Sequence, residues 1–196
     1  MSLSDESIDY LAHFRMPKPV KISARSSSIT NSFVNGIIPV VVPTSEEVRA
    51  ALEILDMLDA VACAYCGDPF TEWDHLRPLV KDKKPTGHIS EIHNLVPACG
   101  KCNQSKGNKP WREWMFGPAA LSPQTRGKSD LEERAARLEA YEVWMPPTRV
   151  NFEELAGDAW DEHWRNHAEI IRLMRAAEDT ARTIRERVKA GYQAEN

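Results

Sequence analysis

Apolar residues recur at intervals of three and four along much of the chain, a spacing that predicts amphipathic helices. The first such helix should run from about residue 45 to 60, because Thr44 and Glu47 have the spacing of a capping box. Its apolar face, expected to pack on the core, comprises Val48, Ala51, Leu52, Leu55 and Leu58. A second helix, charged on most faces, should run from about residue 131 to 144 and end before two prolines.

The longest pattern of this kind lies at the C-terminal end and predicts a helix from residue 158 to about 190. Its narrow apolar stripe comprises Trp160, Trp164, Ala168, Ile171, Met174, Ala177, Ala181, Ile184 and Val188. At 1.5 Å per residue such a helix is roughly 45 Å long, which is longer than a small core can cover. Two arrangements stay open: part of the stripe meets a second chain in a homodimer, or the helix folds back on those at 45–60 and 131–144.

β-Branched residues are dense from Ile29 to Val42, where Pro39 separates two runs of Ile and Val. This composition predicts one edge or irregular strand, because proline cannot donate a hydrogen bond within a sheet. Residues 1–24 are expected to form a short helix or arm that leads into an extended piece. The serines at 26–28 are expected to form a connector between this piece and the predicted strand.

Composition limits the function classes that the chain can serve. Its 196 residues, 42% of them hydrophobic, can bury a core, and no run of about 18 apolar residues predicts a membrane span. A net charge of −4 argues against a strongly basic nucleic-acid-binding protein. The charge is uneven, since residues 63–128 carry ten Lys and Arg against six Asp and Glu, whereas the flanking segments sum to −3 and −5. Affinity for nucleic acid should therefore be moderate and confined to the middle of the chain.

All four cysteines lie in that middle part, as two CxxC pairs separated by 32 residues. Four thiolates at this spacing predict a closed structural zinc site, formed by Cys63, Cys66, Cys99 and Cys102. Disulfides are one alternative, but no apolar signal segment is visible at the start of the chain. A redox-active pair is the other, and it needs a thioredoxin-like βαβ pattern that is not visible either. We therefore expect structural Zn²⁺ in a reduced, cytoplasmic protein.

Oxygen and imidazole groups lie between and beside the cysteines. A zinc ion held by four cysteines has no open coordination position, so catalysis must come from other groups. Asp74 and Asn103 offer hard oxygen ligands that suit Mg²⁺, and His75 offers an imidazole that can take a proton from water. Because neighbouring residues of a strand point to opposite faces, a ligand at 74 and a base at 75 require a bend there.

Together these residues resemble the HNH nucleases of the ββα-metal type, in the version that zinc stabilises. The shared pattern is CxxC, Asp-His, Asn-Leu, CxxCN and Lys-Gly, here Cys63, Cys66, Asp74, His75, Asn94, Leu95, Cys99, Cys102, Asn103, Lys106 and Gly107. It covers about 45 of the 196 residues, and five elements in this order and spacing are specific. Where the oldest family pattern ends in a histidine, this chain has Asn103, a departure that a large branch of the family shares.

The resemblance implies a role for each matching residue. Asp74 and Asn103 would hold one divalent ion, Mg²⁺ or Mn²⁺, and His75 would be the general base that activates water. Asn94 would brace the loop that carries the base. The resemblance also implies hydrolysis of phosphodiester bonds to 5′-phosphate and 3′-hydroxyl ends, in which a metal ion stabilises charge on the phosphate oxygens.

Basic residues after the second CxxC pair are candidates for nucleic-acid contact. We expect a helix to open near Cys99 with its N-terminal amides facing a phosphate, and Lys106, Lys109 and Arg112 lie on or after it. A later loop that could border the same groove contains Arg126 and Lys128. Core packing or ordinary polar roles are favoured for the nearby Trp73, Trp111, Trp114, His88 and His93.

We predict a mostly helical α+β protein with a zinc-stapled ββα-metal motif at its centre. Its expected parts are an N-terminal arm, strand and helix (1–62), the nuclease motif (63–116) and a C-terminal helical region (117–196). The predicted activity is metal-dependent cleavage of DNA, in restriction-like or phage defence. Two alternatives stay open: a nuclease of RNA or structured DNA, and a zinc-binding nucleic-acid-binding module without catalysis.

Overall fold

The computed structural model describes residues 14–195, and contacts divide the chain into two compact units. The larger unit is Ser27–Ala168, and the smaller one combines the segments that precede and follow it. The strands and the cysteine cluster lie within the larger unit, so the candidate site is contained in it. The predicted divisions after residues 62 and 116 stay predictions.

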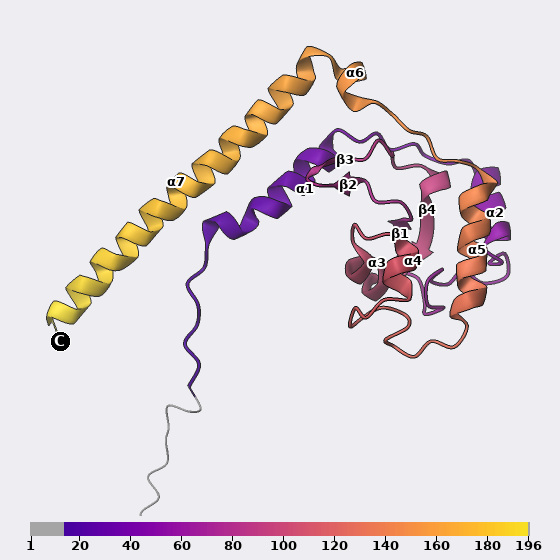
Figure 1. Cartoon of the computed structure of the whole chain (residues 1–196), viewed down its shortest axis with the longest axis horizontal. Helices are drawn as coiled ribbons and strands as arrows, with labels where there is room; N and C mark the ends of the chain where they lie inside the picture. The colour runs from indigo at the N-terminus through magenta and orange to yellow at the C-terminus, as the bar shows by residue number, and fades with distance from the viewer. Residues whose placement is uncertain (1–13, 196) are drawn as a thin grey trace, which may run out of the picture. The chain divides into compact units, whose positions relative to one another are not determined.

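An antiparallel pair of strands forms the centre of the larger unit (Figure 1). In chain order, the elements here are β1 (Glu72–His75), β2 (Val80–Lys81), β3 (Lys84–Pro85), η3 (Ile92–Asn94), β4 (Leu95–Ala98), α3 (Gly100–Lys106) and α4 (Trp111–Met115). β1 pairs with β4 so that Asp74 lies opposite Val96 and His75 opposite Leu95. α3 follows β4 directly, with Cys99 as its N-cap residue. Two strands and a helix in this order, beside a four-cysteine cluster, confirm the predicted α+β class.

The main hydrophobic core lies between this centre and two helices, α2 (Ser45–Ile54) and α5 (Leu131–Trp144). The capping box of α2 is confirmed, because the Glu47 amide donates to Thr44 Oγ1 and the Thr44 amide donates to the Glu47 carboxylate. The predicted bounds of α5 are also confirmed. α2 ends sooner than expected, since the chain turns at Asp56, where φ is 57°.

Tryptophans anchor α4 in the same core. Trp111 and Trp114 are buried, which confirms the packing role predicted for them. The indole N–H of Trp114 donates to Ser105 Oγ at 2.9 Å, and its ring meets Tyr65 edge-on. Trp73 packs at the border of this core. These contacts fix α3 and α4 against the first cysteine loop.

A smaller core cluster includes α1 (Ser26–Gly36), so the strand predicted over 29–42 is wrong as far as Gly36. Its last part is confirmed as an irregular piece, because Val40 forms an isolated parallel bridge with Ser90. Thr30 and Val34 are buried one turn apart on one face of the helix, and Ile38, two residues after its end, is buried as well. Val34 and Ile38 pack in a cluster that also contains Leu79, Val80 and Ile89. The burial of this face outweighs the β-propensity of the individual residues. The serines expected to form a connector are the first turn of the helix.

The C-terminal part of the chain comprises α6 (Phe152–Ala156) and α7 (Asp158–Glu195). α7 begins where the pattern predicts and continues beyond the expected end. Within the larger unit its first turns contact α1, through hydrogen bonds from His163 Nε2 to the Phe33 carbonyl oxygen (3.0 Å) and between His167 Nε2 and Thr30 Oγ1 (2.9 Å). α1 is a partner that neither predicted arrangement included.

In the smaller unit a 3-10 turn, η2 (Ile22–Arg25), contacts the later part of α7. The Ser23 amide donates to Glu178 Oε2 at 3.3 Å. Residues 14–21 precede this turn without regular structure, and the start of the predicted arm lies outside the described residues. Among residues 14–195, no helix combines the length and apolar character needed to cross a membrane.

Candidate functional site

The two CxxC pairs meet at one end of the central motif. Cys63 and Cys66 lie in the loop before β1, and Cys99 and Cys102 lie at the start of α3. All four are buried and free of disulfides, with sulfur atoms within 4.8 Å of one another, and Cys66 Sγ is 3.7 Å from Cys99 Sγ. Zn–S bonds of 2.3 Å in a tetrahedron place the sulfur atoms about 3.8 Å apart. The cluster therefore fits one zinc ion.

The four thiols lie close enough to shift one another's pKa values. Hydrogen bonds with Cys102 and Cys63 lower the pKa of Cys66. Hydrogen bonds with Cys63 and Cys66 raise the pKa of Cys102, and burial adds to that effect. One thiolate therefore keeps its neighbours protonated, and a dication is what would let all four ionise.

Two basic side chains from the loop after α4 lie beside the cysteines. Arg126 Nη1 donates to Cys102 Sγ at 3.5 Å, and its Nη2 is 2.7 Å from Asp68 Oδ2. Lys128 Nζ is 2.6 Å from the other oxygen of Asp68. These contacts place both residues beside the cysteine cluster, and the groove predicted for Arg126 and Lys128 stays a prediction. Their positive charge would partly offset the excess negative charge that four thiolates would bring to one Zn²⁺.

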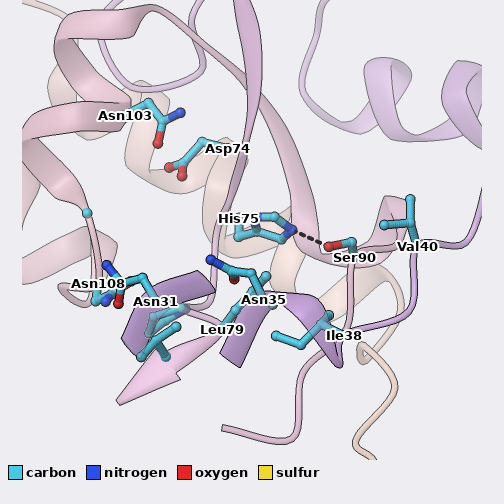
Figure 2. A pocket seen from close by; sticks show the side chains of 13 residues that line it. Asn31, Asn35, Ile38, Val40, Asp74, His75, Leu79, Ser90, Asn103 and Asn108 are labelled. Atoms are coloured by element: carbon cyan, nitrogen blue, oxygen red, sulfur yellow. Dashed lines mark hydrogen bonds between the residues drawn. The ribbon is translucent and has the colours of Figure 1, made fainter. Parts of the chain in front are cut away.

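β1 and α3 place three predicted residues around one cavity of about 400 Å³ (Figure 2). Asp74 and His75 are the last residues of β1, and Asn103 lies in the middle of α3. Other residues that line the cavity include Asn31, Asn35, Ile38, Leu79, Ser90 and Asn108. The structure therefore brings the predicted base and both predicted ligands of the divalent ion to one open space.

Two buried donors hold the Asp74 carboxylate. Tyr65 Oη donates to Asp74 Oδ2 at 2.7 Å, and Lys106 Nζ lies 3.0 Å from the same oxygen. Burial raises the pKa of Tyr65 well above its ordinary value, and the charge of Asp74 adds to the effect, so the phenol remains a donor. Burial lowers the pKa of Lys106, while the attraction of Asp74 raises it. With Oδ2 engaged by both donors, Oδ1 is the carboxylate oxygen left for a metal ion.

The side chains of Asp74 and Asn103 point toward each other, with their oxygen atoms converging (Figure 2). Carboxylate and amide oxygens are hard donors that suit Mg²⁺ and Mn²⁺. Mg²⁺ keeps several waters and takes phosphate oxygens from its substrate, so it needs few protein ligands. Two oxygens beside an open cavity fit that requirement.

His75 ends β1, and the chain bends directly afterwards, at Leu76 and Arg77. The expected bend thus follows the Asp-His pair, and both side chains reach the same cavity. His75 Nε2 lies 2.8 Å from Ser90 Oγ, which leaves Nδ1 to meet a water molecule. Burial lowers the pKa of His75, against the charge of Asp74, so the neutral form that accepts a proton is favoured.

Asn94 is the residue before β4, and its side chain holds the segment that follows His75. Its Oδ1 accepts the Arg77 amide proton at 2.8 Å, and its Nδ2 donates to the Arg77 carbonyl oxygen at 3.1 Å. The side chain is fully buried and does not reach the cavity. Asn94 therefore acts on the backbone beside the site.

Lys106 does not have the exposed position predicted for a nucleic-acid contact. It is fully buried, and its Nζ donates to the His75 carbonyl oxygen at 2.7 Å while pairing with Asp74. The expected phosphate site at the start of α3 is corrected as well, because Cys99 caps this end of the helix at the cysteine cluster. Lys106 holds two site residues in place.

The other two basic residues predicted to contact nucleic acid lie outside the cavity. Arg112 forms ion pairs with Glu139 and Glu132 of α5 and lies over aromatic rings of α4. Lys109 is exposed, and its Nζ donates to the Ser105 carbonyl oxygen at 2.8 Å. Contact with nucleic acid stays a prediction for Lys109 and Arg112.

Sequence reasoning missed several residues that complete the site. Tyr65 and Ser90 carry no motif signal, because their roles follow only from contacts with Asp74 and His75. Asn31 and Asn35 lie on α1, where the sequence predicted a strand instead of a helix. The four-residue spacing of the buried face of α1 was the signal that could have placed them on a helix.

Comparisons with known proteins cover the central motif. The family model for HNH endonuclease matches residues 63–109. The CRISPR-associated endonuclease Cas9 of Corynebacterium diphtheriae is 45% identical over 56 residues, which are 26% of this chain and 5% of that protein. The chain therefore matches only a small part of this much longer relative. No solved structure matches the chain.

Proposed function

We propose, from the premise that residues 63–109 form an HNH endonuclease domain, that this protein cleaves DNA by metal-dependent hydrolysis of phosphodiester bonds. The observation that carries the proposal is the meeting of Asp74, His75 and Asn103 around one cavity. A module that only binds nucleic acid has no need for a buried, oriented carboxylate beside a neutral imidazole. The geometry therefore favours catalysis over the binding-module alternative.

His75 is the proposed general base. Its Nδ1 takes a proton from the attacking water, while the contact of Nε2 with Ser90 sets the ring orientation. Water oxygen then bonds to phosphorus as the bond to the 3′-oxygen breaks, and the leaving oxygen gains a proton from solvent. This sequence yields 5′-phosphate and 3′-hydroxyl ends.

Asp74 and Asn103 are the proposed ligands of one Mg²⁺ or Mn²⁺ ion, which would stabilise the charge that develops on the phosphate oxygens. Tyr65 and Lys106 hold Asp74 through Oδ2 and so turn its other oxygen toward the cavity. Lys106 and Asn94 also hold the backbone at and after His75. This chain thus presents the base and the ligands in a fixed geometry before substrate binds.

Structural Zn²⁺ is the proposed occupant of the four-cysteine cluster. It would join the loop before β1 to the start of α3. Because Asp74 and His75 lie on β1 and Asn103 on α3, this link would keep the base and the ligands in register. Zinc would thus support catalysis without taking part in it.

DNA is the proposed substrate, and restriction-like or phage defence the proposed role. The likeness to part of a CRISPR-associated endonuclease supports endonuclease activity. We also propose a homodimer through the later part of α7, where Ile184, Val188 and Tyr192 are exposed. Sedimentation of the purified protein tests this, and a monomer at all concentrations would contradict it.

A panel of matched substrates tests the function. Purified protein is incubated with modified and unmodified plasmid, single-stranded and branched DNA, and RNA, each with Mg²⁺, Mn²⁺ or EDTA. We expect plasmid cleavage with either metal ion, none with EDTA, and product ends that ligase can rejoin. Cleavage confined to RNA or branched DNA would replace the proposed substrate. Binding without cleavage of any substrate would support the non-catalytic module.

A further inference from the structure

α1 presents two asparagines to the catalytic cavity. Thr30 and Val34 are buried on one face of the helix, and Asn31 and Asn35 each follow one of these positions. Residues four apart share a face, so the two asparagines lie one turn apart on a neighbouring face. Both line the cavity, and both are exposed. The buried face of α1 therefore fixes the direction of its polar one.

The asparagines lie across the cavity from the proposed metal ligands. Figure 2 shows Asp74 and Asn103 on one side of His75, and Asn31 and Asn35 on the other. If one phosphate of a nucleic-acid strand lies between Asp74 and His75, the neighbouring part of that strand runs along the side of the cavity that the two asparagines form. The residues available to meet that strand are those of α1.

The cavity is lined without any lysine or arginine among the described residues. Lys106, the nearest basic residue in the motif, is buried and engaged by Asp74. Neutral donors must therefore supply most of the protein's contacts to the strand inside the cavity. The amide of asparagine carries two N–H donors, which suit phosphate and sugar oxygens.

We propose that Asn31 and Asn35 bind the sugar-phosphate backbone of the strand that is cut, next to the bond that breaks. This inference rests on the proposed nuclease function and adds a binding surface from outside the HNH domain. The helix α1 acts as the second wall of the active site. The two side chains position the strand against His75 and do not take part in proton transfer.

Alanine substitution tests the proposal. Asn31→Ala, Asn35→Ala and the double variant are compared with wild type, and Asn166→Ala serves as an exposed helical control away from the cavity. Alanine favours helix more than asparagine does, so lost activity would not reflect a weakened α1. Thermal unfolding of each variant checks that the fold is kept.

Binding is measured on a duplex oligonucleotide with zinc-loaded protein and no added Mg²⁺, and cleavage on a plasmid with Mg²⁺. Each single variant should weaken binding about tenfold, because a hydrogen bond to a charged group is lost. The salt dependence of binding should keep its slope, since a neutral donor releases no counterions. Asn35→Asp, which replaces donors by a negative charge at equal size, should weaken binding further. Asn166→Ala should match wild type.

The outcomes distinguish failure of this inference from failure of the proposed function. Wild-type protein that cuts no substrate would refute the nuclease, yet the binding comparison would still test the asparagines. Unchanged binding and cleavage in the double variant would overturn the inference while leaving the nuclease intact. A loss that depends on base sequence would also overturn it, because backbone contacts affect all sequences equally.

Discussion

The ammonium group of Lys106 lies between the carboxylate of Asp74 and the carbonyl oxygen of His75, and no part of its side chain reaches solvent. Burying a lysine in this way is unfavourable unless a partner offsets the lost hydration. Here the carboxylate is 3.0 Å away. Lys106 is therefore a positioning residue that acts on a metal ligand and on the base together.

Replacing Lys106 with Met should lower the free energy of unfolding by about 3 to 5 kcal/mol, because the buried carboxylate of Asp74 loses its counter-charge. Urea unfolding of zinc-loaded protein without Mg²⁺ measures the change. Lys109→Met is the matched control at an exposed position and should shift it by less than about 0.5 kcal/mol. Equal unfolding midpoints for the two variants would show that Lys106 does not stabilise the site.

The pH dependence of cleavage should reflect His75. The active form of the base is neutral, and it is lost as the pH falls through the pKa. Burial lowers this pKa below its ordinary value of about 6.5, so the single-turnover rate should reach half its maximum at a pH below about 6.5. A rate that already declines between about pH 8 and 7 would be inconsistent with a lowered pKa.

For individual residues, the sequence predicts roles that a local motif carries, but not roles that depend on contacts with residues far away in the chain. Asp74, His75 and Asn103 are predictable, because their chemistry and spacing belong to one recognisable pattern. The burial of Lys106 is not, since a lysine before a glycine suits an exposed phosphate contact equally well. Its partner is 32 positions away in the chain, and only packing brings the two together.

The elements were predictable in proportion to the strength of their boundary signals. α5 ends before two prolines and α2 begins at a capping box, and both signals are confirmed. α1 was not predicted because β-branched residues and Pro39 are typical of an irregular strand, whereas buried positions spaced by four indicate a helix. That spacing stabilises a helix only through contacts with Leu79, Val80 and Ile89, which the local sequence does not reveal.

The loop after α4 should control how firmly the cysteine cluster holds zinc. Arg126 donates to Cys102 and pairs with Asp68, so Arg126→Met removes a positive charge beside the thiolates. We expect zinc release to a chelator to become about tenfold faster, as is typical for outer contacts of a metal site. Arg49→Met, at an exposed position on α2, is the control. Equal release rates for the two variants would exclude a role for Arg126 at the cluster.

For the whole molecule, the charge of −4 and a cavity that no lysine or arginine of residues 14–195 lines both limit non-specific attraction to DNA. Few phosphates are then neutralised on binding, and the logarithm of affinity should fall with the logarithm of salt concentration with a slope of roughly −3. Titration of a duplex oligonucleotide at several salt concentrations measures it. A slope steeper than about −6 would show a basic surface that this account does not contain.

The role of His75 as the general base is tested most directly by the rate at which supercoiled plasmid disappears in Mg²⁺. Wild type and His75→Ala are compared at matched zinc content. We expect a rate loss of at least about a hundredfold with zinc content and melting temperature unchanged, since only the base is removed. Cleavage by His75→Ala at the wild-type rate, in preparations free of other nucleases, would contradict the assignment of this cavity as the catalytic centre.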